Sequence, residues 1–410
     1  MKQEIILDAA QGRVTLALIE DGTVREVMLC RAHDEVSQPG AIYWGRVQRV
    51  MPGIQAAFVD IGLEKNAFLP LGEAHRVHPP VRQGEGYLVQ VRRQPKGDKG
   101  LCVAREITMP GRLAVLLPIG GEGGVSAKIT AEGERARLKA LAQVLCAPGE
   151  AVIWRTAAQG ASERALADEL AEQRALWQRL AAQGAHRREP GLLWAAQHPV
   201  ERFVRDALGE SLARVVVGDD VWHERLARVL PAWGADPARL LTRYAGTLPM
   251  QDAYGVRRAI TNGLHRRVWL DCGGFLIFDT CEAMTVVDVN TGKYAGSATL
   301  EETAFTVDCE AARAVAEQLR LRDVGGIVVI DFIDLRDETH REALMNALRA
   351  ALTADRGKPV LVGGMSELGL VQLTRKRLYG GLAEAARAPC PTCGTMARVP
   401  HSEQESEESP

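Results

Sequence analysis

Strong charge of either sign is missing from this chain of 410 residues, whose formal net charge at pH 7 is −2. A polyanionic partner would therefore be bound by local basic patches, because the overall field of the protein does not attract it. Long apolar runs are missing too: no stretch of about 18 uncharged apolar residues occurs, and the amino-terminal residues lack the pattern of a signal peptide. We expect a cytoplasmic protein with no membrane association.

Cysteine is scarce, with eight residues in the chain. Isolated cysteines inside apolar segments are typical of small buried side chains in a reducing compartment. Six fit this pattern: Cys30, Cys102, Cys146, Cys272, Cys281 and Cys309. The remaining two, Cys390 and Cys393, form the pair in APCPTCGT.

This pair offers two of the four ligands of a tetrahedral zinc site. No second such pair follows, so the other two thiolates would come from another chain, in a homodimer. A redox-active pair is an alternative, although that motif is expected near the start of a βαβ unit, and an unliganded pair is another.

The chain is 46% hydrophobic and 25% charged, and its length suits several domains. Residues 1–36 alternate apolar and polar side chains around the turn signals Gln11-Gly12 and Asp21-Gly22, which predicts an antiparallel meander. Residues 37–110 continue with short strand-like segments and frequent turns. This pattern is typical of a closed five-stranded barrel of the OB type.

Helical periodicity begins within residues 111–199, after a first strand-like segment. The Ala-, Arg- and Leu-rich stretch 162–183 could be a basic RNA-binding helix. Acidic residues interleave with its arginines, however, so we favour an ordinary solvated helix. These acids are Glu163, Asp168, Glu169 and Glu172.

Residues 200–262 alternate helices with one strand, and residues 263–388 alternate strands and helices, so we predict a multidomain α/β protein. Residues 389–397 hold the cysteine pair. The acidic segment 398–410 is predicted to be a disordered tail.

Two apolar runs of the α/β segment contain acids: VVDVN at 286–290 and GGIVVIDFIDL at 325–335. A helical pattern over 300–320 separates them, which predicts a right-handed crossover between parallel strands. Asp288 and Asp331 would then meet at the carboxyl-terminal edge of the sheet, where open α/β sheets bind ligands.

Two facing carboxylates repel each other unless a cation neutralises them, and no Lys or Arg occupies either strand end. The oxygen ligands suit Mg²⁺ or Mn²⁺, and Asn290 would project beside Asp288. Solvated strand-end acids are the alternative. Asp334 is expected on the opposite face, as the cap of a helix that begins near Arg336.

Several segments, in order and over nearly all of residues 1–395, resemble the bacterial ribonuclease E/G family, and its ribonuclease G branch in particular. They are IYWGRVQRVMPGIQAAFVDIGLEKNAFLPL, RTAAQG, VVDVNTGKYAG, EETAF, AEQLRLRDVGGIVVIDFIDL, GLVQLTRKR and CPTCG. The resemblance implies an RNase H-like domain (1–36 and 200–262) that encloses an S1 barrel (37–110) and a 5'-sensor (111–199). A DNase I-like catalytic domain (263–388) and a zinc link (389–397) would follow.

By this resemblance, Asp288 and Asp331 would hold a catalytic Mg²⁺ with Asn290 in support, for hydrolysis of single-stranded RNA to 5'-phosphate and 3'-hydroxyl ends. Such enzymes act in ribosomal RNA maturation and messenger RNA decay. In the barrel, Phe58 and Phe68 match exposed aromatics that stack on bases, and phenylalanines of the barrel core are the alternative.

Lys99 of the barrel matches a lysine that contacts the RNA backbone. The family's 5'-monophosphate sensor is matched by Arg155 and Thr156, with Gly111 and Val115 as its supporting wall.

The sequence departs from the family pattern at three places. Lys358 stands where ribonuclease E-like members carry an arginine near the sensor, and a lysine cannot bind a phosphate in bidentate fashion. Trp44 replaces a common basic residue in the first barrel strand. The small domain that follows the zinc link in other members is not expected here, so zinc would carry more of the dimerisation.

Two competing functions use the same residues. A non-catalytic RNA-binding regulator would use the barrel without turnover, and a nuclease acting on DNA could use the same two-acid metal site.

Overall fold

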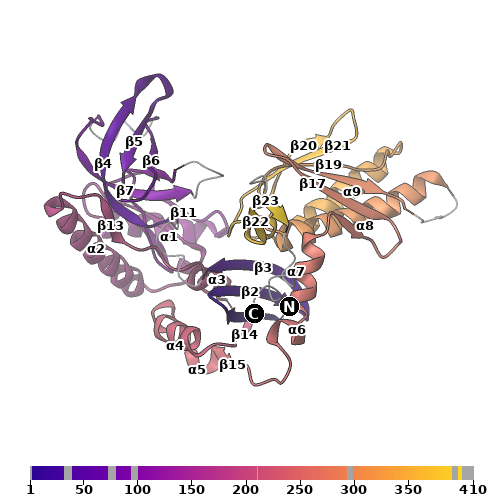
Figure 1. Cartoon of the computed structure of the whole chain (residues 1–410), viewed down its shortest axis with the longest axis horizontal. Coiled ribbons are helices and arrows are strands. Elements are labelled where there is room, and N and C mark those ends of the chain that lie inside the picture. Colours follow the sequence, from indigo (N-terminus) through magenta and orange to yellow (C-terminus); the bar gives the residue numbers. More distant parts are fainter. Residues whose placement is uncertain are drawn as a thin grey trace, which may run out of the picture. The chain divides into compact units, whose positions relative to one another are not determined.

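The computed structural model describes residues 2–31, 39–72, 80–93, 100–209, 211–292, 299–389 and 396–398. These residues form two compact units, Met1–Ala32 with Ala207–Pro410, and His33–Asp206 (Figure 1). Lys99, Cys390 and Cys393 lie outside the described residues. The strands that flank the cysteine pair, β22 (Arg387–Pro389) and β23 (Met396–Arg398), are antiparallel to each other.

The first unit contains a five-stranded sheet in the order β15-β14-β1-β2-β3. Its strands are β1 (Gln3–Ala10), β2 (Arg13–Glu20), β3 (Thr23–Arg31), β14 (Leu212–Val217) and β15 (Leu241–Arg243). The predicted meander is confirmed, since β1, β2 and β3 are antiparallel and both turns adopt positive φ angles. β14 adds to β1 in parallel, whereas β15 was not predicted.

The helices that follow β14 and β15 are short, as is α10, which comes later in the chain. They are α4 (Asp220–Val229), α5 (Pro237–Leu240), α6 (Met250–Ala253), α7 (Val256–Leu264) and α10 (Leu382–Ala385). Apolar residues of the sheet, α7 and α10 share one core, which Leu321 also joins.

A six-stranded sheet in the order β16-β17-β18-β19-β21-β20 forms the other part of the first unit. Its elements are β16 (Arg267–Trp269), β17 (Phe275–Thr280), β18 (Met284–Asn290), α8 (Leu300–Leu321), β19 (Gly326–Asp331), α9 (Glu338–Leu352), β20 (Val360–Met365) and β21 (Leu370–Arg375). β18 and β19 are parallel neighbours joined through α8, so the predicted crossover is confirmed.

Helices α8 and α9 cover one face of this sheet, as Figure 1 shows. Alternate strand residues such as Leu276, Val287 and Ile330 point into the core that these helices share. Their neighbours along the strands, such as Ile277 and Asp288, therefore belong to the face without a helix. This arrangement leaves the face that carries the candidate acids open.

The carboxyl-terminal turn of α8 is tied to the first sheet by buried charges. The guanidinium of Arg320 donates to both carboxylate oxygens of Glu20, at 2.8 and 3.0 Å, and to Glu26 at 3.0 Å. Burial alone would raise the pKa of Glu26, but Arg356 and Arg320 outweigh it and hold that pKa below its usual value. Such fully paired charges fix the orientation of α8 relative to β2 and β3.

The second unit begins with a barrel in which β4, β5, β6, β8 and β7 follow one another and β4 pairs with β7. Its strands are β4 (Ile42–Met51), β5 (Ala56–Asp60), β6 (Ala67–Pro70), β7 (Gly86–Arg93) and β8 (Cys102–Ala104), and β13 (Gly191–Trp194) adds to β4. The predicted five-stranded closed barrel is confirmed. Gly45 permits close packing inside it, since a Cβ there would lie 2.5 Å from Cγ1 of Val59.

A four-stranded sheet in the order β11-β12-β10-β9 completes the second unit. Its elements are β9 (Met109–Pro110), β10 (Ala114–Leu117), β11 (Gly124–Val125), α1 (Glu132–Leu145), β12 (Ala151–Trp154), the 3-10 helix η3 (Thr156–Ala158) and α2 (Glu163–His186). A further helix, α3 (Pro199–Ala207), reaches the boundary between the units.

Two expectations need correction. None of the six isolated cysteines is fully buried: five are half-buried and Cys281 is exposed. The helix after β19 begins at Glu338 and is capped by Asp337, which accepts from the amide of Thr339, so Asp334 is not its cap. In the part of the chain that the structure describes, no helix has the length and apolar composition needed to cross a bilayer.

Candidate catalytic edge, sensor and RNA-binding barrel

Asp288 and Asp331 are direct Cα partners in the register of β18 and β19. Parallel neighbours bring their last residues to the same edge of the sheet, so two acids 43 positions apart in the chain lie side by side. The adjacent residues Val287 and Ile330 anchor both strands in the core. The two residues therefore meet at one edge of the sheet, as the predicted crossover requires.

Asn290 stabilises this pair from one side. Its amide nitrogen Nδ2 donates to Oδ2 of Asp288 at 2.8 Å, which leaves its own amide oxygen available as a ligand. Residues 288 and 290 share a face because side chains alternate along a strand.

Electrostatics at this edge favour a cation. Burial, followed by the negative charges of Asp288 and Asp334, raises the pKa of Asp331. Among the described residues, neither Asp288 nor Asp331 forms an ion pair with a lysine or arginine, although the charge of Arg266, which is paired with Asp279, acts on Asp288. Two carboxylates and an amide oxygen are hard donors that fit a divalent ion such as Mg²⁺. No group of three or more His, Cys, Asp or Glu side chains suited to a metal occurs in the described part, so water would complete the coordination.

Carboxylates of α8 hold the loop that follows Asp331. Oδ1 of Asp308 accepts from the amide of Ile333 at 3.1 Å, and the carboxylate of Glu301 accepts from the amides of Arg336 and Asp337 at 3.0 to 3.1 Å. These backbone hydrogen bonds lower the pKa of Glu301. The position of the loop is thus set by the same helix that joins the two aspartate strands.

Asp308 is a feature that sequence reasoning missed. It is completely buried, and Oδ2 has no hydrogen-bond partner among the described residues. Burial raises its pKa to about 8. The signal was present in the sequence, since position 308 lies one helical turn from Ala304 and Ala312 on the predicted apolar face of α8.

Four of the five candidate sensor residues, Gly111, Val115, Arg155 and Thr156, lie in the second unit. Arg155 precedes η3, and its Nη1 donates to the carbonyl of Gly111 at 2.6 Å. The Thr156 hydroxyl lies 3.0 Å from that of Ser126. Val115 is on β10, where it pairs with Pro110 and Ile153.

Arg155 already has one anionic partner. Its Nη2 lies 3.2 Å from Oδ1 of Asp206. Burial alone would raise the pKa of Asp206, but Arg205 and Arg155 outweigh burial and lower it. A phosphate at Arg155 would therefore compete with a carboxylate.

Helix α2 packs against the wall of the candidate sensor. One of the acids predicted to lie on its solvated face, Glu169, therefore bonds to the protein backbone instead. Glu169 accepts from the amides of Leu113 and Ala114 at 2.8 to 3.1 Å. A Cβ at Gly111 would lie 2.3 Å from Oε1 of Glu169 and 2.2 Å from Nε2 of Gln173. A larger residue at this position would therefore displace the side chains of Glu169 and Gln173.

Lys358 belongs to the other unit. It follows α9, is exposed, and adopts a left-handed φ of 49°.

Phe58 and Phe68 lie opposite each other on β5 and β6, with ring centroids 6.0 Å apart in an edge-to-face arrangement. Their strand neighbours Ala57 and Leu69 point into the barrel core, whereas the two rings are half-buried and outside it. This geometry favours exposed aromatics over core phenylalanines. Trp44 is also half-buried, and the guanidinium of Arg46 lies 5.7 Å from its ring centroid.

Known proteins identify the chain. Residues 108–378 match the Ribonuclease E/G family. Ribonuclease G of Escherichia coli strain K12 is 37% identical over an alignment of 419 positions. The alignment covers 97% of this chain and 85% of that protein. This chain belongs to the ribonuclease E/G family. It is an endoribonuclease of that family.

Other family members align over a similar range of this chain. Ribonuclease G of Haemophilus influenzae is 36% identical, covering 97% of this chain and 84% of that protein. Ribonuclease E of Nostoc sp. strain PCC 7120 is 34% identical, covering 97% of this chain and 59% of that protein. Membership of the ribonuclease E/G family implies an RNA substrate and a metal-dependent reaction.

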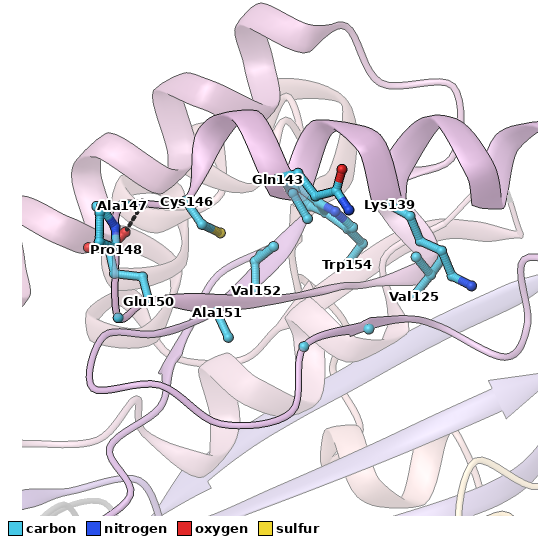
Figure 2. A pocket seen from close by; sticks show the side chains of 14 residues that line it. Val125, Lys139, Gln143, Cys146, Ala147, Pro148, Glu150, Ala151, Val152 and Trp154 are labelled. Atoms are coloured by element: carbon cyan, nitrogen blue, oxygen red, sulfur yellow. Dashed lines mark hydrogen bonds between the residues drawn. The ribbon is translucent and has the colours of Figure 1, made fainter. Parts of the chain in front are cut away.

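A separate cleft of about 710 Å³ lies in the second unit of this ribonuclease E/G family protein, between α1, β12 and the segment 123–125 (Figure 2). Lys139 is the one basic side chain among its lining residues. The cleft contains none of the candidate sensor residues. One wall is braced by Trp154, whose indole Nε1 donates to the carbonyl of Leu138 at 2.7 Å.

Proposed function

We propose that this protein is a Mg²⁺-dependent endoribonuclease that cleaves single-stranded RNA and prefers substrates with a 5'-monophosphate. Its products would carry 5'-phosphate and 3'-hydroxyl ends, and its roles would be ribosomal RNA maturation and messenger RNA decay. The observation that supports the proposal is the register of β18 and β19, in which Asp288 and Asp331 are direct partners and neither has an ion pair among the described residues.

Asp288 and Asp331 would hold Mg²⁺. When bound, the ion supplies positive charge that activates water and offsets charge on the phosphodiester. Asn290 orients Asp288 through the hydrogen bond from Nδ2. Glu301 and Asp308 position the loop after Asp331. The chain thus contributes two adjacent acids that form no ion pair among the described residues.

Substrate selection is assigned to the second unit. Phe58 and Phe68 would stack on bases of a single strand, and Lys99 would contact the RNA backbone. Arg155 and Thr156 would bind the 5'-monophosphate against the wall formed by Gly111 and Val115.

Lys358 would assist 5'-end recognition as a point charge. Because a lysine cannot pair with a phosphate in bidentate fashion, we propose weaker discrimination of 5' ends than an arginine would provide.

Cys390 and Cys393 are proposed to bind one Zn²⁺ together with the same pair of a second chain. The antiparallel pairing of Pro389 with Met396 supports this, because it brings the two ends of the cysteine-containing segment together. Metal analysis, together with light scattering before and after chelation, tests it. A zinc-free protein of unchanged size would contradict the shared site.

Cleavage of an A/U-rich oligonucleotide with a 5'-monophosphate tests the main proposal. Wild type should cut it only with Mg²⁺, and Asp331→Asn should bind it without cutting. Asp252→Asn is a matched control, because it removes an exposed acid of α6. A protein that binds but never cuts, with every divalent ion tried, would be a regulator instead.

Two further substrates separate the remaining alternatives. The DNA version of the oligonucleotide should be cut much more slowly, and equal rates would favour a general nuclease. A 5'-hydroxyl version should be cut less efficiently than the monophosphate, and Arg155→Gln should abolish that difference.

A further inference from the structure

The open face of the six-stranded sheet carries an aromatic pair in the same register rows as the catalytic edge. Trp269 pairs with Phe275, and Phe275 pairs with Asn290. Directly paired residues point to the same side of a sheet. Both rings therefore lie on the face that carries Asp288, Asn290 and Asp331.

The rings form a fixed unit with a cation. Their centroids lie 5.4 Å apart in an edge-to-face arrangement. The guanidinium of Arg267 lies 4.5 Å from the centroid of Phe275 and 5.5 Å from that of Trp269. Gly292 packs against this unit, since a Cβ there would lie 3.3 Å from Cδ1 of Phe275. The geometry of the pair is thus set by its surroundings.

Burial of apolar surface does not explain the pair. Trp269 is 60% exposed, although Leu276 and Phe278 on the other face of β17 are buried in the core. An exposed tryptophan beside an arginine offers a flat apolar surface and a positive charge together. That combination suits a nucleobase with its phosphate better than it suits an apolar protein segment.

The distance from the catalytic edge fits the substrate of this enzyme. Adjacent strands lie about 4.8 Å apart, so Phe275 is one strand and Trp269 two strands from β18. A nucleotide close to the cleaved phosphodiester can reach both rings while its phosphate stays near the acids.

We propose that Trp269, Phe275 and Arg267 form a stacking site for one base of the RNA strand close to the scissile phosphodiester. The site rests on the proposed function, and it is separate from the barrel aromatics. It orients the strand across the open face, so that the phosphodiester next to the stacked base is presented to Asp288 and Asp331.

A cycle that changes both the enzyme and the substrate tests the site. Oligonucleotides that carry a single abasic residue, placed in turn at each position around the cleavage site, are cut by wild type and by Trp269→Ala. Wild type should lose about 5- to 100-fold in kcat/KM at one position. Trp269→Ala should show a similar loss with the intact strand and little further loss with that abasic strand.

Conservative variants distinguish stacking from simple apolar contact. Trp269→Tyr keeps an aromatic face and should retain most activity, whereas Trp269→Leu keeps only bulk and should behave like Trp269→Ala. Leu248→Ala is the control, because Leu248 is similarly exposed, at 63%, but lies outside this sheet. The loss of kcat/KM caused by Phe58→Ala should multiply with the loss caused by the abasic residue, because Phe58 would contact a different base.

The proposal would be overturned if the losses in kcat/KM caused by Trp269→Ala and by the abasic residue multiplied at every position, because the two changes would then be independent. So would full activity of Trp269→Leu, or a change in oligomer size without any effect on RNA. If wild type cuts no RNA, the proposed function fails, and the site is then judged by binding alone. Equal affinity of wild type and Trp269→Ala for the intact and abasic strands would refute it.

Discussion

Three residues before β19, the carboxylate of Asp323 accepts from Arg375 and from the amides of Leu378, Tyr379 and Gly380. At the end of the same strand, Asp331 faces Asp288, and burial together with acidic neighbours raises its pKa. The strand thus follows a carboxylate that is ion-paired and hydrogen-bonded to three backbone amides, and it ends at a carboxylate that has no ion pair in the described part of the chain.

The difference separates stability from function. Arg375 also binds Asp355, and neither side chain has measurable exposure. Removing one partner of such a buried cluster leaves an uncompensated charge in the core. The two acids at the other end are exposed to solvent, where a ligand can neutralise them.

Asp331→Asn should have the largest effect on activity and almost none on stability. Mg²⁺-dependent cleavage should fall at least roughly 100-fold, since a proposed metal ligand is lost. The free energy of unfolding should stay the same or rise, because repulsion with Asp288 disappears. Cleavage assays and urea denaturation measure both, and a clearly destabilised variant would contradict the comparison.

Arg375→Met, near the other end of β19, should strongly lower stability and have little direct effect on the cleavage reaction. We expect a loss of about 3 to 5 kcal/mol in the free energy of unfolding, because Asp323 and Asp355 lose their partner. Arg25→Met is the control, since its ion pair with Glu317 is partly exposed and should contribute only about 0 to 1 kcal/mol. Equal losses in the two variants would remove the distinction.

Asp308 is an intermediate case, with one oxygen bonded and the other without a partner. Its pKa of about 8 in the folded state lies above the ordinary 3.8, so the folded protein keeps a proton that the unfolded chain releases. The free energy of unfolding should therefore fall as the pH rises from 3.8 to about 8 and level off above that. Asp308→Asn should flatten this pH dependence of the free energy of unfolding, measured by denaturation at several pH values. An unchanged pH dependence would exclude Asp308 as its cause.

Asp206→Asn should have the smallest effect and extends the comparison to the second unit. Removing the acid beside Arg155 should favour a bound phosphate, and we expect a few-fold rise in the cleavage ratio of 5'-monophosphate to 5'-hydroxyl substrates. Arg205→Gln, which changes the other partner of Asp206, should move the ratio less. A fall in the ratio would mean that Asp206 positions Arg155 productively.

Much of the fold was predictable because local patterns and tertiary structure agree. The turns at Gln11-Gly12 and Asp21-Gly22, the crossover through α8 and the barrel all follow from periodicity and turn residues. The prediction of Asp334 as the helix cap was wrong, because Asp337 is an equally suitable residue type and only the path of the loop selects it.

Some residues of the candidate site could be predicted from the sequence and others could not. Sequence reasoning brought Asp288, Asn290 and Asp331 together, because a crossover between parallel strands leaves little freedom. It missed Trp269 and Phe275, since a short strand with alternating residues does not reveal which face lacks a helix.

By itself, the sequence determined which strands are joined by α8 and hence that two acids end at one sheet edge. Only the tertiary structure decided which carboxylates acquire arginine partners, as Asp323 does, and which remain uncompensated, as Asp331 does. The reason is physical: strand pairing depends on local periodicity, whereas charge compensation depends on side chains as distant as Glu20 and Arg320, which meet only after the chain has packed.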